Sequence, residues 1–203
     1  MDSVAILIPA AGSSSRMRGR DKLMEEIDGV PLLLRTVGRA LRTGCKVLVT
    51  VPRDRPDRVA ALTTLDHPNL MIGPPLDARE GMSVSLRHGA GWASDAHPAP
   101  AGLMILLADM PDVTTQDIQT VLSAFVQAPD RVHRAVSQSG QPGHPVVFPR
   151  RLFRQLAEVT GDSGAREVMA NEALVTVPLP GDHATTDLDT PEDWAAWRAR
   201  HKS

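Results

Sequence analysis

Cysteine, aromatic side chains and long apolar runs are all scarce in this sequence of 203 residues. With three Phe, three Trp and no Tyr, the core has to be built mainly from Leu, Val, Ile, Ala and Met. The single Cys45 excludes a disulfide within the chain, and no apolar run approaches the roughly 20 residues that a bilayer-spanning helix needs. Because no basic region precedes the first apolar stretch, we expect no secretory signal and a location in a reducing cytoplasm.

A strong excess of either charge is also absent, because 22 Lys and Arg stand against 24 Asp and Glu and give a net charge of -2. No long-range field therefore favours nucleic acid or an anionic membrane as a partner, and any anion site has to be built locally. Charge runs, internal repeats and linker segments are missing, so the length predicts one domain that spans residues 1–203.

Short apolar runs rich in Val, Ile and Leu alternate with stretches of helical periodicity. The apolar runs cover residues 4–9, 46–51, 69–72, 102–108, 134–137, 146–148 and 174–177. Helical spacing follows Pro31 and recurs over residues 83–92, 114–126, 150–159 and 164–171, and Thr190, Pro191 and Asp193 open a last helix. This alternation predicts an α/β fold, with a mainly parallel sheet between two helix layers. The glycine-rich stretch 137–145 predicts a β-hairpin flap beside that sheet.

Ligands of an open parallel sheet collect at the carboxyl ends of its strands, and the first such segment is PAAGSSSRMRGRDK, residues 9–22. Its small residues let a ligand approach the backbone closely, so their amides can point at phosphate oxygens while Arg16 and Lys22 add positive charge. The segment lacks both the P-loop pattern and the dinucleotide pattern GxGxxG. The local pattern alone fits a triphosphate cradle and a solvated glycine-serine turn about equally well.

Acidic residues follow two further apolar runs. Asp109 lies in LLADMP, where a wholly apolar strand ends, and Asp187 and Asp189 lie in TDLDTPED. Two acids two positions apart point the same way in an extended segment and can share a cation. The alternatives are that Asp109 caps a helix or closes a turn, and that Asp189 merely precedes a capped helix while Asp187 is exposed.

Three more motifs are individually weak. They are EGMSVSLRHG at residues 80–89, SGQPGHP at residues 139–145 and GDSGAR at residues 161–166. Gly81 and Ser83 can simply start a helix, and a lone His144 is more often structural or exposed than catalytic. The three motifs indicate a function only in combination, because their occurrence together in one chain is far less expected by chance.

Together these segments resemble the nucleotidyltransferase superfamily, and their combination resembles its molybdenum cofactor cytidylyltransferase branch. The resemblance rests on an acid followed by Met and Pro, on an acid pair before TPED, and on AAGxxxRM followed by Gly19, Asp21, Lys22 and Leu23. The motifs GMSxSL, GHP and GDxGAR occur in the family's order, so the resemblance covers nearly the whole chain. Pro9 departs from the family pattern, which usually has Leu or another aliphatic residue there.

The resemblance implies a Rossmann-like nucleotidyltransferase fold and a Mg²⁺-dependent reaction. In that reaction a terminal phosphate of a molybdenum-pterin cofactor attacks the α-phosphorus of CTP, and pyrophosphate leaves. The implied catalytic residues are Arg16, Lys22 and Asp109. The implied metal-site residues are Asp109, Asp187 and Asp189, of which Asp189 holds the loop or a metal-bound water. The implied nucleotide-binding residues are Ala10, Ala11, Gly12, Ser13, Arg16, Lys22, Ser83 and Ser85, and the acceptor-binding residues are His144 and Arg166.

The first loop also indicates the base. AAG accompanies the cytidylyl enzymes of the family and AGG the guanylyl enzymes, and this chain has Ala10, Ala11 and Gly12. We therefore expect CTP as the donor, a phosphorylated pterin as the acceptor and a molybdenum oxidoreductase as a candidate partner. The alternatives are guanylyl transfer, transfer to a sugar phosphate, and a non-catalytic carrier of the molybdenum cofactor. The joint presence of basic and acidic site residues argues against the carrier.

Overall fold

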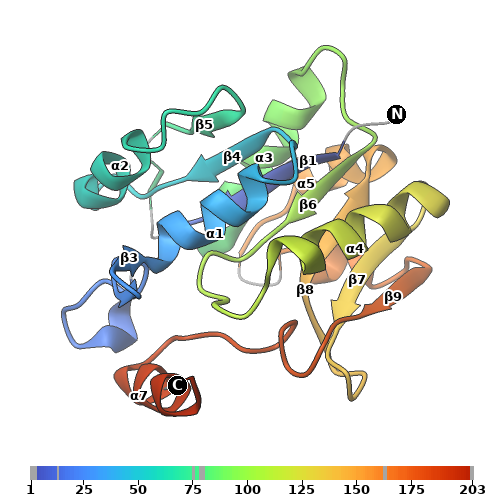
Figure 1. The fold of residues 1–203 in the computed structure, drawn as a ribbon. Coiled ribbons are helices and arrows are strands. Elements are labelled where there is room, and N and C mark those ends of the chain that lie inside the picture. The colour runs from blue at the N-terminus through green and yellow to red at the C-terminus, as the bar shows by residue number, and fades with distance from the viewer. Residues whose placement is uncertain (1–3, 13, 75, 78–80, 162–163, 202–203) are drawn as a thin grey trace.

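The computed structural model describes residues 4–12, 14–74, 76–77, 81–161 and 164–201. Its main feature is a seven-stranded sheet with the strand order β5-β4-β1-β6-β8-β7-β9 (Figure 1). Its strands are β1 (Val4–Pro9), β4 (Val47–Thr50), β5 (Leu70–Ile72), β6 (Gly102–Ile105), β7 (Val132–Val136), β8 (Pro142–Pro149) and β9 (Leu174–Pro178). A separate two-stranded sheet pairs β2 (Glu26–Ile27) with β3 (Val30–Pro31).

The large sheet is mostly parallel. β1 runs parallel to β4 and β6, β4 to β5, and β7 to β9, whereas β8 runs antiparallel to both β6 and β7. The carboxyl ends of β1, β4 and β6 therefore lie at the same edge as the amino end of β8. This edge is where an open sheet of this kind binds its ligands.

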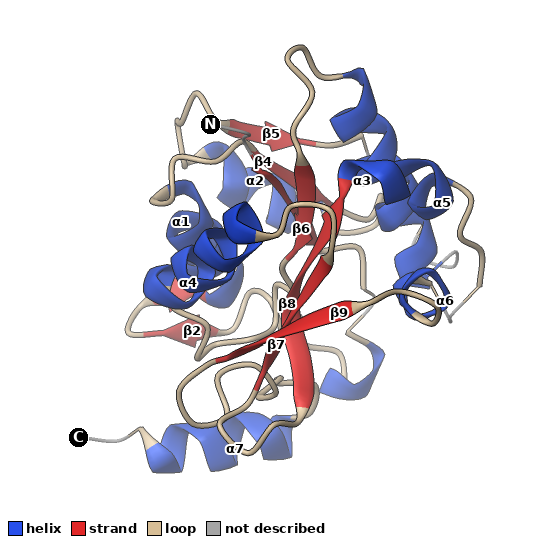
Figure 2. Cartoon of the chain, turned by 90° about the vertical axis from the view of Figure 1, so that its right-hand side faces the viewer, coloured by secondary structure: helices blue, strands red, loops and turns tan. Residues whose placement is uncertain are grey.

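Helices cover both faces of the sheet (Figure 2). The helices of one face are α1 (Leu32–Leu41), α2 (Pro56–Thr63) and α4 (Thr115–Gln127), and those of the other are α3 (Gly81–Asp95), α5 (Phe153–Ala157) and α6 (Ala165–Met169). Successive side chains of β1 point to opposite faces of the sheet and so enter two hydrophobic cores. Ile6 and Ile8 pack with α1 and α4, whereas Ala5 and Leu7 pack with α3 and α5. The predicted three-layer α/β fold is thus confirmed.

The expected hairpin at residues 137–145 is present, but it is not a flap beside the sheet. Its strands β7 and β8 both lie within the seven-stranded sheet, and its turn is closed by the Ser137 amide, which donates to the Gln141 carbonyl at 2.8 Å. Residues 142–145, which the glycine and prolines made look like a loop, are the first half of β8. In this half the His144 amide donates to the Ala184 carbonyl at 2.9 Å, so the backbone around residue 184 forms a hydrogen bond with β8.

Two helical segments differ from the sequence-based expectation. The helical periodicity misses α2 because its inward face consists of Arg58 and Leu62, and an arginine stands where an apolar side chain is expected. The helix expected at residues 150–159 begins as a 3-10 turn, Arg150–Leu152, and continues as the short α5. None of the helices within the described ranges combines the length and the apolarity needed to cross a membrane.

The last helix closes the ligand-binding edge. α7 (Pro191–Arg200) begins at the predicted capping box, in which Thr190 accepts from the Asp193 amide. Its Trp194 and Trp197 pack with Met17 and Leu188 in a third core cluster. The helix therefore holds the segment after β1 and the segment around residue 188 against each other.

The close approach of α3 to β1 gives a stability prediction. A Cβ added at Gly89 would lie 2.4 Å from Leu7 Cδ2, and Leu7 is fully buried. We expect Gly89→Ala to lower the free energy of unfolding by about 1–3 kcal/mol, as overpacking of a dense core does. Gly91→Ala is the matched control on the same helix, because a Cβ there meets nothing within 4 Å. Urea unfolding of both variants checks this, and equal effects of the two changes would contradict it.

Candidate active site

The segment after β1 folds back over the carboxyl end of its own strand. Ala10 is buried and donates its amide to the Thr50 carbonyl at 2.8 Å, which continues the pairing of β1 with β4. A 3-10 turn, Ser15–Met17, follows between two residues in the left-handed region, Ser14 at φ 55 and Arg18 at φ 53. Ser13, expected to bind the nucleotide, lies outside the described residues.

Arg58 of α2 binds this loop without lining the cavity that the loop helps to form. Arg58 was not identified from the sequence as a functional residue. Its guanidinium is fully buried and donates to the carbonyls of Ala10 at 2.5 Å and Gly12 at 2.9 Å, to Ser14 Oγ at 3.0 Å, and to both carboxylate oxygens of Asp21 at 2.7 Å. Burial raises the pKa of Asp21, but the hydrogen bonds and charge of Arg58 outweigh it, so that pKa lies below its usual value. The feature of the sequence that could have indicated this role is a basic residue on the inward face of a helix.

Lys22 joins three segments that are distant in the sequence. Its Nζ donates to Asp109 Oδ2 and to Asp189 Oδ1, both at 2.5 Å, and Arg16 Nη1 pairs with Asp189 Oδ2 at 2.8 Å. Burial lowers the pKa of Lys22, but the charges and hydrogen bonds of the two carboxylates outweigh it and raise that pKa. The structure therefore brings together the basic and acidic residues that the sequence singled out.

Asp187 completes the acidic group. Burial raises its pKa first, and the charges of Asp109 and Asp189 raise it further, because each carboxylate disfavours a second negative charge nearby. The neighbouring Leu188 amide donates to the Asp109 carbonyl at 3.1 Å. A Cβ at Gly143 would lie 1.8 Å from the Ala184 carbonyl oxygen, so only glycine lets this segment pack so closely on β8.

The acidic group fits a hard divalent cation. Asp109 and Asp187 influence each other electrostatically, and one or two carboxylates are what Mg²⁺ usually takes from a protein. Within the described ranges, no three His, Cys, Asp or Glu side chains are grouped to enclose an ion. An ion at this place would therefore take its other ligands from phosphate oxygens and water. Asp189 accepts from Lys22 and Arg16 with its two oxygens.

A cavity of about 430 Å³ lies between the loop, β6 and the start of α3. Its lining includes Ala11, Gly12, Arg16, Lys22, Ser85 and Asp109. The Ser85 hydroxyl accepts from Thr50 Oγ1 at 3.0 Å. Ser83 is buried and accepts from Arg87 at 3.4 Å, and it lines neither this cavity nor its neighbour. The structure thus places Ser85, and not Ser83, at the cavity wall.

A second cavity of about 530 Å³ adjoins the first, since Met82 and Leu107 line both. The polar side chains in its lining include Arg134, Gln141, His144, Arg166 and Asp187. The two expected acceptor-binding residues therefore lie in one cavity beside the acidic group. Arg134, which sequence reasoning missed, donates to the Gly143 carbonyl at 3.2 Å, and burial together with the charge of Arg166 lowers its pKa.

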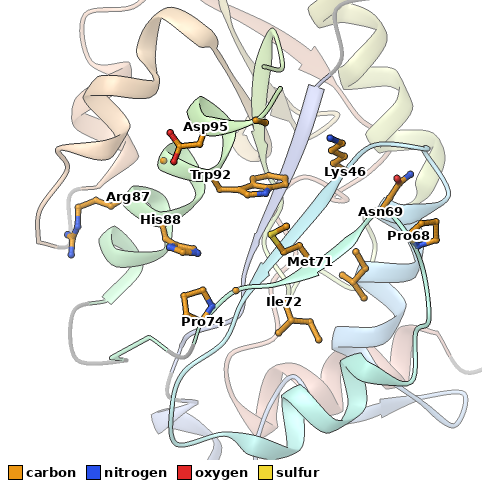
Figure 3. Close-up of a pocket in the computed structure, with 14 residues that line it drawn as sticks. Lys46, Pro68, Asn69, Met71, Ile72, Pro74, Arg87, His88, Trp92 and Asp95 are labelled. Carbon is orange, nitrogen blue, oxygen red and sulfur yellow. The ribbon is translucent and has the colours of Figure 1, made fainter. Parts of the chain in front are cut away.

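A larger hollow of about 750 Å³ lies elsewhere, between β5 and α3 (Figure 3). None of its lining residues lines either cavity described above. Trp92 and Met71 contribute much of its wall, and Asp95 is the only acidic residue of the lining. Because it lacks a carboxylate pair, size alone does not make it the site of metal-dependent chemistry.

His144 gives a pH prediction. Burial, and then the charges of Arg134 and Arg166, lower its pKa from 6.5 to about 4, and its Nδ1 is buried without a hydrogen-bond partner among the described residues. The unfolded chain takes up the proton first, so stability due to neutral His144 is present above pH 6.5 and is lost as pH falls toward 4. The whole loss is about 3 kcal/mol at most.

Two measurements check this prediction. An NMR titration should give His144 a midpoint near pH 4. The difference in unfolding free energy between the wild type and His144→Gln should shrink as pH falls through that window, because the variant has no imidazole to titrate. A midpoint near 6.5, or a difference that does not change with pH, would contradict the buried neutral ring.

Comparison with known proteins identifies the family of the chain. The family described as MobA-like NTP transferase domain matches residues 6–177. A "molybdenum cofactor guanylyltransferase" of Pseudomonas paraeruginosa is 29% identical over 199 residues, which cover 93% of this chain and 91% of that protein. A "probable molybdenum cofactor guanylyltransferase" of Synechococcus elongatus is 27% identical over 197 residues, 95% of this chain and 96% of the other.

Solved structures show the same fold. The crystal structure of Rv0371c from Mycobacterium tuberculosis has a TM-score of 0.78 at 22% identity and covers 97% of this chain and 98% of its own, and a manganese complex of that protein has a TM-score of 0.74. A CMP:2-keto-3-deoxy-manno-octonic acid synthetase complexed with CTP has a TM-score of 0.73 at 15% identity, with 98% of both chains covered. The fold is therefore the Rossmann-like fold of nucleotidyltransferases. The chain belongs to the family of MobA-like NTP transferase domains and is a nucleotidyltransferase.

Proposed function

We propose that this enzyme transfers CMP from CTP to the terminal phosphate of a molybdenum-pterin cofactor and releases pyrophosphate, with Mg²⁺ as the metal. The observation that carries the proposal is the meeting of Lys22, Asp109 and Asp187 between two adjoining cavities. One cavity is walled by the small residues of the first loop and suits a triphosphate. The other contains two arginines and suits a phosphorylated acceptor.

The chemistry follows from the charges at this junction. Two anions have to approach each other, because the acceptor phosphate attacks the α-phosphorus in line with the departing pyrophosphate. Lys22 and Arg16 offset this repulsion and stabilise the charge that builds up on the phosphorus centre and the leaving group. A Mg²⁺ ion held by Asp109 and Asp187 would neutralise and orient the phosphates. A phosphate nucleophile is already ionised near neutral pH, so positioning replaces a strong general base.

The second cavity supports an acceptor that is both anionic and polar. Arg134 and Arg166 supply positive charge, and the neutral His144 can donate or accept a hydrogen bond near neutral pH. These groups fit a phosphate joined to a heterocycle that is rich in donors and acceptors, as a pterin is. The molybdenum oxidoreductase that would receive the product is part of the same proposal.

The donor base has two candidates. Ala11 is buried, lines the first cavity and stands where the resemblance associates Ala with cytidylyl enzymes, which supports CTP. GTP is the second candidate, because the relatives from Pseudomonas paraeruginosa and Synechococcus elongatus carry the name guanylyltransferase.

Turnover with each of the four nucleoside triphosphates tests the donor. With a molybdenum-pterin acceptor and Mg²⁺, we expect pyrophosphate release to be fastest with CTP. Faster release with GTP would overturn the cytidylyl assignment and leave the transfer reaction standing. A sugar phosphate in place of the pterin serves as the acceptor control. Nucleotide binding without pyrophosphate release under any of these conditions would indicate a carrier in place of an enzyme.

The acidic residues are tested separately. Asp109→Asn keeps the shape of the side chain but removes a charge, and we expect kcat to fall by about 10²- to 10³-fold, the usual effect of losing one preorganised charge contact. Asp187→Asn should also lower kcat and weaken Mn²⁺ binding measured by electron paramagnetic resonance in the presence of nucleotide. Asp66→Asn is the control, because Asp66 is an exposed acid outside both cavities. Wild-type kcat and Mn²⁺ affinity in the Asp109 and Asp187 variants would contradict the metal assignment.

A further inference from the structure

We propose that Arg58, on α2, is a positioning residue for nucleotide binding. Its guanidinium sets the conformation of the loop at residues 9–22 from the side that faces away from the first cavity. It lines neither of the two site cavities, so it acts through the loop and through Lys22. The inference rests on the proposed function only in naming a nucleoside triphosphate as the ligand.

The contacts of Arg58 use the whole guanidinium. Five hydrogen bonds leave its three nitrogens and reach the carbonyls of Ala10 and Gly12, the hydroxyl of Ser14 and both oxygens of Asp21. Its side chain is 0% exposed. Lysine cannot reproduce this set, because an ammonium group has three donors and no planar fork. Burying a charged group costs free energy even when each of its nitrogens forms a hydrogen bond. The stability of α2 alone does not require such a group, so Arg58 serves the loop.

The carbonyl contacts determine where the loop amides point. In a trans peptide the C=O of one residue and the N–H of the next point in opposite directions. The bond from Arg58 to the Ala10 carbonyl therefore directs the Ala11 amide away from Arg58. Ala11 lines the first cavity, so its amide is available to a phosphate oxygen there. The amide direction is set before a ligand arrives.

A second branch of the network reaches Lys22. Arg58 and the Lys22 amide both donate to Ser14 Oγ, at 3.0 and 3.3 Å, and that hydroxyl donates to Asp21 Oδ1 at 3.2 Å. The Leu23 amide donates to the same Asp21 oxygen at 3.0 Å. One guanidinium thus fixes both ends of the loop, and the backbone that places Lys22 is held by it. Such preorganisation lowers the entropy cost of ordering the loop when the nucleotide binds.

The test compares Arg58→Lys with Arg53→Met. Arg53 is an exposed arginine five residues earlier, so its replacement controls for the loss of a guanidinium that does not hold the loop. CTP and GTP are the probes, with dissociation constants measured by calorimetry in the presence of Mg²⁺. We expect Arg58→Lys to weaken binding of the preferred nucleotide by about tenfold or more and to raise its KM, while the KM of the acceptor stays unchanged. Arg53→Met should change none of these values.

Hydrogen exchange separates positioning from general loss of stability. Without nucleotide, amide exchange in residues 10–23 should speed up in Arg58→Lys and stay unchanged in Gly102→Ala. The latter variant is destabilised far from the loop, because a Cβ there would lie 2.6 Å from the Phe125 ring. If wild-type protein bound neither CTP nor GTP, the proposed function would fail, and the exchange rates would still decide the role of Arg58.

A double variant covers the case in which a single change prevents folding. Arg58→Met with Asp21→Asn removes the buried guanidinium together with the charge of its half-buried partner and leaves no uncompensated carboxylate. Weaker nucleotide binding and faster loop exchange in this folded double variant would support the inference. Wild-type nucleotide affinity and wild-type exchange in either Arg58→Lys or the double variant would overturn it.

Discussion

A lysine ammonium group between converging carboxylates is the interaction on which the site depends. Asp109 follows β6, and Asp189 follows a segment that pairs with β8 and with the Asp109 carbonyl, so the two acids meet from positions 80 residues apart in the chain. Burial, and then the charges of these two acids, raise the pKa of Asp187, so the three carboxylates repel one another. Lys22 supplies the counter-charge through its ion pairs with Asp109 and Asp189. Lys22 thus links the loop after β1 to both acidic segments, beside the Arg16–Asp189 ion pair and the packing of Met17 and Leu188 on α7.

The same charges explain why a divalent cation belongs to the proposed reaction. Three carboxylates against Lys22 and Arg16 leave one negative charge at the junction. A triphosphate in the first cavity and a phosphorylated acceptor in the second would each add more negative charge. The arginines of the second cavity offset part of it, and Asp109 and Asp187 provide the oxygen donors that a hard cation prefers. In the proposed reaction, an added positive charge where the two substrates meet would offset this excess of negative charge.

Sequence reasoning reached most of the fold, because alternating apolar runs and capping boxes are local signals. β1 was predicted to the residue, and Thr190 with Asp193 opens α7 as expected. The meeting of Asp109 with the acids at residues 187 and 189 was implied by the family resemblance, because β9 ends at Pro178, well before these acids. The features that the sequence did not predict depend on packing between residues that are distant in the chain. The first half of β8 looks like a loop because Pro142, Gly143 and Pro145 mask its pairing, and Arg58 lies on a helix whose inward face is partly polar.

The choice of base shows where similarity along the whole chain stops being informative. In the proposed reaction, the loop at residues 9–22, Lys22 and the acidic group would act on parts that every nucleoside triphosphate shares, so relatives with different donors could keep all of them. Base choice depends on a few hydrogen bonds to the edge of the ring and on the space left at positions such as Ala11. One methyl group there accounts for about 1–3 kcal/mol, a small part of the total binding energy. An overall identity of 27–29% therefore carries the reaction class and not the base, and under the proposed function the side chains around Ala11 would decide the donor.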